Sequence, residues 1–141
     1  MRWFAALLLS LYAVLVARLT VADPSAGRPF FDLLYNGGAE VSGGRLDASR
    51  LEVLGNIALF VPAGLLLAIV LQRGMLAIGL LVLVSIGIEL AQQQWLPSRV
   101  PSLADVEHNG LGAVLGVVMF WFGLQLVRAL SGERRSTGQP A

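Results

Sequence analysis

The feature that most constrains this chain is a series of four long apolar runs separated by short polar segments. The first run covers residues 3–22, and the others cover about residues 51–71, 75–95 and 102–130. A helix needs about 20 predominantly apolar residues to cross a bilayer. The sequence therefore predicts an all-α, polytopic membrane protein with four transmembrane helices in a small bundle.

The composition supports a lipid environment and excludes several functions. The 141 residues are 56% hydrophobic and 13% charged, with a mean hydropathy of +0.74, whereas soluble domains carry about 25% charged residues. A net charge of +1 without a clustered basic face argues against a nucleic-acid partner. With no Cys and only one His, the chain offers no usual metal site, and we expect no cofactor.

The first run, residues 1–22, has two interpretations. Arg2 precedes the apolar core and Ala22 ends it among small residues, as in a cleaved signal peptide. The length of the run is closer to a membrane span than to a signal-peptide core of about 7 to 15 residues. We favour a retained first transmembrane helix that acts as a signal-anchor, and cleavage stays open as the alternative.

Two polar segments complete the predicted organisation. Residues 23–50 are rich in Pro and Gly and predict a polar, extracytoplasmic loop in which Asn36-Gly37 forms a tight turn, with a helix beginning near Asp47. Ser102 and Asp105 resemble a capping box that begins the fourth span. Residues 131–141 are predicted to be a disordered polar tail.

The lengths of the Arg-containing segments indicate the orientation, because the number of arginines is nearly equal on the two faces. One face of the membrane receives Arg2, Arg73, Arg128, Arg134 and Arg135, and the other receives Arg28, Arg45, Arg50 and Arg99, with Arg18 near it. The segments on the first face are short, and the positive-inside rule operates best on short segments. We therefore expect both termini in the cytoplasm and the polar loops outside.

Alternating topology brings polar residues of three spans to one end of the bundle. These residues are Asn56, Glu89, Gln92, Gln93, Arg99, Asp105 and Asn109. Helical spacing places Glu89 with Gln92 and Asp105 with Asn109 on shared faces. The pattern predicts a polar pocket that opens outward.

Glu89 is the most informative of these residues, because a carboxylate at mid-span costs about 2.5 to 3.5 kcal/mol on insertion scales. It requires either a basic partner, for which Arg99 is the nearest candidate, or a functional role. The alternatives are an internal Glu89–Arg99 salt bridge and a ligand-binding pocket, of which we favour the second. Asn56 and Asn109 fit interhelical hydrogen bonding and ligand binding equally well.

Two motifs resemble the VanZ-like family. The first runs from Asn56 through Pro62 to Gly64 and resembles its N-x-x-x-F-x-P-x-G motif. The second comprises Glu89, Gln92, Arg99, Asp105, Asn109, Gly112 and Gly116. Within it, Gly112-x-x-x-Gly116 is a GxxxG pattern that permits close helix packing, so we assign Pro62, Gly64, Gly112 and Gly116 to helix packing.

The resemblance spans roughly residues 51–120 and implies a three-helix membrane region over 51–130. The family is named for an accessory protein of glycopeptide-resistance clusters that is associated with reduced susceptibility to teicoplanin. It therefore implies a multi-pass protein of the bacterial cytoplasmic membrane with a role in the cell envelope. His108 departs from the family pattern, which usually has an apolar residue there.

Three functions follow as hypotheses. In the first, Arg99, Asn56 and Asn109 bind the head group of an envelope lipid, a lipid precursor or a lipoglycopeptide while its acyl chain lies among the helices. In the second, Glu89 and Asp105 are the acid-base pair of an intramembrane hydrolase or transferase. In the third, the Gly112/Gly116 face packs a non-catalytic scaffold into a homo- or hetero-oligomer.

Overall fold

The computed structural model describes residues 2–22, 28–41, 43, 47–95 and 102–136, and all regular structure in these ranges is helical. The elements are α1 (Arg2–Ala17), the π-helical turn η1 (Arg18–Ala22), α2 (Arg28–Val41), α3 (Ala48–Leu71), α4 (Gly74–Trp95) and α5 (Leu103–Ser136). In four of the helices, a segment is long and apolar enough to cross a membrane: Arg2–Thr20, Ser49–Leu71, Gly74–Trp95 and Leu103–Ser131. The prediction of an all-α chain with four membrane-spanning helices is confirmed.

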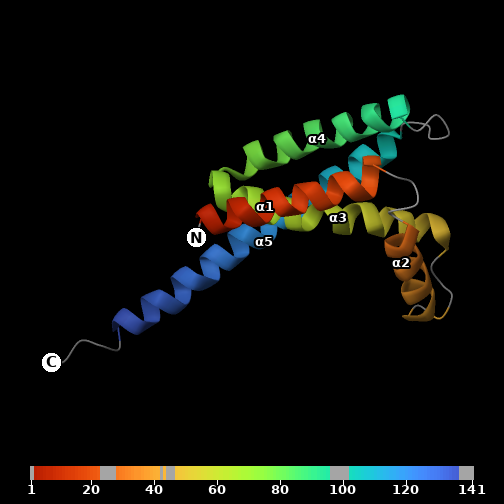
Figure 1. Ribbon diagram of the computed structural model, residues 1–141. Helices are drawn as coiled ribbons and strands as arrows, with labels where there is room; N and C mark the ends of the chain where they lie inside the picture. The colour runs from red at the N-terminus through yellow and green to blue at the C-terminus, as the bar shows by residue number, and fades with distance from the viewer. Residues whose placement is uncertain (1, 23–27, 42, 44–46, 96–101, 137–141) are drawn as a thin grey trace.

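The pair α3 and α5 forms the centre of the bundle (Figure 1). Helix α1 packs along α3, and α4 packs on α5 and α3, so α4 contacts the first span mainly through η1. The N-terminus and the α3–α4 turn lie at one end, while the beginning of α3, the end of α4 and the beginning of α5 meet at the other (Figure 1). The polar residues predicted to converge, as far as they lie in the described ranges, belong to this second end.

Glycines set the close approach of α5 to α3. A Cβ at Gly112 would overlap the carbonyl oxygen of Ile57, and a Cβ at Gly116 would overlap that of Val61. The GxxxG sequence therefore allows backbone contact between two helices of the same chain. Because α3 covers this face, an oligomer formed through the same glycines would require α3 and α5 to separate.

The other two residues assigned to packing lie in α3. A Cβ at Gly64 would overlap the carbonyl oxygen of Ala113, so this glycine belongs to the same interface. Pro62 lies inside the helix, where its ring nitrogen has no hydrogen to donate to the carbonyl of Ala58. The helix nevertheless continues through it to Leu71.

Within the polar loop predicted over 23–50, residues 28–41 form a helix, α2, where turns were expected. Gly and Pro content suggested turns, but Asp32, Asn36 and Glu40 recur at every fourth position and share one helical face. Apolar residues occupy most of the other positions, which gives an amphipathic helix that suits a membrane surface. The Asn36-Gly37 pair consequently lies within a helix and makes no turn. Helix α2 lies across the beginning of α3 (Figure 1).

The prediction of a disordered tail was wrong for residues 131–136, where α5 continues to Ser136. Glu133, Arg134 and Arg135 are strong helix formers, and Gly132 alone costs only about 1 kcal/mol relative to Ala. Residues 137–141 lie outside the described ranges. The last turns of α5 extend beyond the other helices (Figure 1).

Candidate functional site

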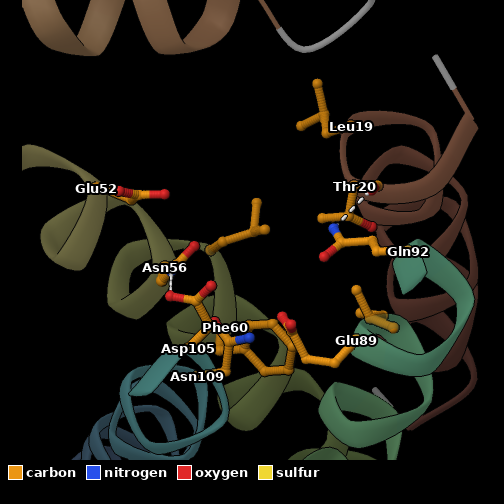
Figure 2. Close-up of a pocket in the computed structure, with 11 residues that line it drawn as sticks. Leu19, Thr20, Glu52, Asn56, Phe60, Glu89, Gln92, Asp105 and Asn109 are labelled. Atoms are coloured by element: carbon orange, nitrogen blue, oxygen red, sulfur yellow. Dashed lines mark hydrogen bonds between the residues drawn. The ribbon is translucent and has the colours of Figure 1, made fainter. Parts of the chain in front are cut away.

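A small pocket lies where η1, α3, α4 and α5 meet (Figure 2). Its polar lining consists of Thr20, Glu52, Asn56, Glu89, Gln92, Asp105 and Asn109. The space open to water is about 40 Å³, which holds only a few water molecules. The site is therefore narrow and admits a small polar group without rearrangement.

Hydrogen bonds between helices hold the α5 side of the pocket. The amide nitrogen of Asn56 donates to Asp105 Oδ1 over 2.8 Å, which joins α3 to the first turn of α5. One turn further along α5, the amide nitrogen of Asn109 donates to Ser85 Oγ of α4 over 2.9 Å. Asn109 and Ser85 are buried, with 6% and 0% of their surface exposed, so this second bond lies inside the bundle.

The α4 side of the pocket is held by bonds to backbone groups. Glu89 Oε2 accepts from the backbone N–H of Ser102 over 2.9 Å, immediately before α5. This carboxyl group thus satisfies a donor at the positive end of the α5 dipole. Gln92 donates to the backbone carbonyl of Thr20 in η1 over 2.7 Å. Through Glu89 and Gln92, α4 fixes both the start of α5 and the end of the first span.

An apolar groove of about 610 Å³ adjoins the polar pocket. It is lined by α1, α3 and α4, and it runs where α1 and α4 do not close on each other. Leu59, Phe60 and Ile88 line both the groove and the pocket. A molecule with a polar end and an apolar chain could therefore occupy the two together.

The structure brings five of the six predicted binding residues to this pocket: Asn56, Glu89, Gln92, Asp105 and Asn109. Arg99 lies outside the described residues, so the structure tests neither its role nor the Glu89–Arg99 salt bridge. Gln93 is exposed and does not line the pocket.

Sequence reasoning missed Glu52, which lines the pocket one turn before Asn56, as well as the Ser85 hydroxyl and the Thr20 carbonyl. Ser85 precedes Glu89 by four residues and Gln92 by seven, so helical spacing could have placed it on the same face. The carbonyl of Thr20 had no such signal, because its availability depends on the backbone of the π-helical turn.

Comparison with known protein families identifies a match for this chain. The family model described as VanZ/LLP1 matches residues 4–126, a region that includes all four spans except residues 2–3 of the first and 127–131 of the last. No curated protein matches the chain, and no solved structure matches it. The match covers most of the chain and includes every residue that lines the pocket. The protein therefore belongs to the VanZ/LLP1 family.

Proposed function

We propose that this protein binds an envelope lipid, a lipid precursor or a lipid-bearing glycopeptide, with the polar group in the pocket and the hydrocarbon chain in the groove. The observation that carries the proposal is the shared wall of Leu59, Phe60 and Ile88. The groove volume of about 610 Å³ falls within the roughly 300 to 1,000 Å³ of ordinary ligand sites. Arg99 stays a candidate for contacting an anionic part of the head group.

The proposed location is the bacterial cytoplasmic membrane, with both termini in the cytoplasm. This orientation rests on the short Arg-containing segments of the cytoplasmic face. The pocket would then open on the outer side, where lipid-linked envelope precursors and glycopeptide drugs are encountered.

Lipid retention tests the proposal. The full chain is purified in mild detergent, and the bound lipid is measured by native mass spectrometry. Ala13 lines the groove, so Ala13→Phe should reduce retention at least about fivefold, by filling space that the hydrocarbon chain needs. Ala58→Phe on the exposed side of α3 is the matched control. Equal retention by wild type and Ala13→Phe would refute the proposal.

A role in teicoplanin-type resistance is the finer part of the proposal. A susceptible strain expressing the wild type should tolerate more teicoplanin, with little change towards vancomycin, because only teicoplanin carries a lipid chain. Arg99→Ala and Asp105→Asn at matched membrane abundance should lose the protection. Growth identical to empty vector for all three proteins would remove the resistance role and leave lipid binding to be judged separately.

The intramembrane hydrolase or transferase stays a second candidate, because Glu89 and Asp105 line the same pocket. Each already accepts a hydrogen bond, from Ser102 and Asn56 respectively, as expected of groups that position a ligand. Turnover of an envelope lipid by the purified protein that is abolished in Glu89→Gln and Asp105→Asn would favour the enzyme.

A further inference from the structure

The side-chain amide oxygens of Asn56 and Gln92 are open hydrogen-bond acceptors in the pocket. Gln92 donates to a backbone carbonyl and Asn56 donates to a carboxyl oxygen. Because a carbonyl and a carboxylate only accept, the amide nitrogens must face these partners and the amide oxygens must face away. Figure 2 shows the side-chain oxygens of Asn56, Gln92 and Glu89 turned into the pocket.

Asn109 adds a buried acceptor to this set. Its amide nitrogen is engaged by Ser85, and its Oδ1 has no hydrogen-bond partner among the described residues. The side chain is only 6% exposed and lines the pocket. A buried acceptor without a donor is unfavourable, so a hydrogen-bond donor that enters the pocket would stabilise this oxygen in the orientation that the structure shows.

Carboxyl groups give the pocket its electrostatic character. Glu52, Glu89 and Asp105 line it, and the described part of its lining contains no basic side chain. The bonds from Ser102 and Asn56 each engage one carboxyl oxygen, of Glu89 and Asp105 respectively. The second oxygen of each can receive a further donor.

We propose that the pocket recognises the protonated primary amine of a lipid head group, through Glu89, Asp105 and Asn109, with the hydrocarbon of the same lipid in the adjoining groove. An ammonium group has three donors and a positive charge, which match one amide oxygen and two carboxyl groups. It is also compact enough for a space of about 40 Å³. The inference rests on the proposed lipid binding and adds the chemistry of the head group.

Lipids with identical chains test this inference, because their contacts with the groove are equal. Dioleoyl phosphatidylethanolamine, its N-methyl and N,N-dimethyl forms, phosphatidylcholine and phosphatidylglycerol are each titrated into the detergent-solubilised full chain and followed by native mass spectrometry. The ethanolamine lipid should bind at least about tenfold more tightly than the choline and glycerol lipids. Successive N-methylation should reduce affinity in steps, since each methyl removes a donor.

Isosteric variants of the pocket residues test whether the preference for the ethanolamine lipid arises in the pocket. Glu89→Gln and Asp105→Asn retain an oxygen for Ser102 and Asn56 but lose the carboxyl charge, so they should bring the ethanolamine lipid to within about threefold of the choline lipid. Glu107→Gln, on the exposed side of α5, is the matched control and should keep the full preference. Should a pocket variant fail to fold, the N-methylation series on the wild type still decides the inference.

The outcomes separate the two proposals. If all the lipids bind with equal affinity and Ala13→Phe weakens the binding of each, amine recognition is overturned and the proposed lipid binding still stands. Insensitivity of every lipid to Ala13→Phe would overturn the proposed function itself. A preference for phosphatidylglycerol would overturn the inference in favour of an anionic head group. Displacement of the bound lipid by an equal concentration of free ethanolamine would show that the ligand is a soluble amine.

Discussion

Polar side chains inside the bundle link helices that are distant in the sequence. Asn56 reaches Asp105, and Asn109 reaches Ser85. Tyr12 of α1 donates its hydroxyl hydrogen to the carbonyl of Leu59 over 2.6 Å. In a hydrocarbon solvent such bonds position helices, because apolar surface alone distinguishes poorly between protein and lipid.

At the scale of single residues, Gly116→Ala should destabilise the protein by about 1 to 3 kcal/mol, the usual cost of overpacking a well-packed site. The added Cβ would overlap the carbonyl oxygen of Val61 and push α5 away from α3. Gly123→Ala is the matched control on the same helix, where a Cβ meets no atom within 4 Å. The control should be neutral or stabilising by up to about 1 kcal/mol. Thermal unfolding in detergent measures both, and equal melting temperatures would contradict the observed interface.

The Asn109–Ser85 bond should appear as an interaction energy in a double-mutant cycle. Asn109→Leu and Ser85→Ala should couple by about 0.6 kcal/mol, the average for interhelical hydrogen bonds in membranes, and by no more than about 1.7 kcal/mol. Pairing Asn109→Leu with Ser10→Ala is the control, since the hydroxyl of Ser10 donates to the carbonyl of Ala6 in its own helix and to no other helix among the described residues. Additive effects in the first pair would show that the bond contributes no stability.

At the scale of elements, α5 depends on contacts at its first turn. Ser102 Oγ accepts from the N–H of Asp105 over 3.3 Å, as expected of an N-cap. The backbone N–H of Ser102 donates to Glu89 of α4. The end of one span therefore fixes the beginning of the next at the pocket.

Removing the cap should affect α5 more than the same change elsewhere on the helix. Ser102→Ala should cost about 1 kcal/mol, the usual loss for a serine N-cap. Ser131→Ala near the other end of α5 removes only a bond to the carbonyl of Val127 and should lie within about 0.5 kcal/mol of wild type. Chemical unfolding of the two variants compares them, and indistinguishable midpoints would show that the cap does not stabilise the helix.

At the scale of the whole molecule, four spans place the two polar ends of the bundle on opposite sides of the membrane. Val41 at the end of α2 and Ser131 in the last turns of α5 lie at opposite ends, and both are exposed. Since the chain has no Cys, a single introduced Cys reports on which side of the membrane its position lies.

Val41→Cys should react with a membrane-impermeant maleimide in intact cells, whereas Ser131→Cys should react only after permeabilisation. The inverse pattern would place the pocket on the cytoplasmic side, against the proposed encounter with external glycopeptides. Reaction of both positions in intact cells would contradict a four-span topology.

The sequence by itself determined that the helices lie in lipid, how many spans there are and at which end of the bundle polar groups gather. Long, predominantly apolar runs form little else than helices in a bilayer, and successive spans must cross the membrane in opposite directions because short segments connect them. The glycine spacing likewise predicted close packing, because only residues without a Cβ permit it. These properties depend on local composition and periodicity.

Only the tertiary structure decided which groups face one another. Gln92 bonds to the carbonyl of Thr20, a backbone atom that no side-chain pattern marks. The groove exists because α1 packs on α3 and leaves a gap to α4, which depends on the crossing of helices far apart in sequence. The orientations of the Asn56 and Gln92 amides follow from these distant acceptors, so the amide oxygens that face the pocket are set only when the helices are assembled.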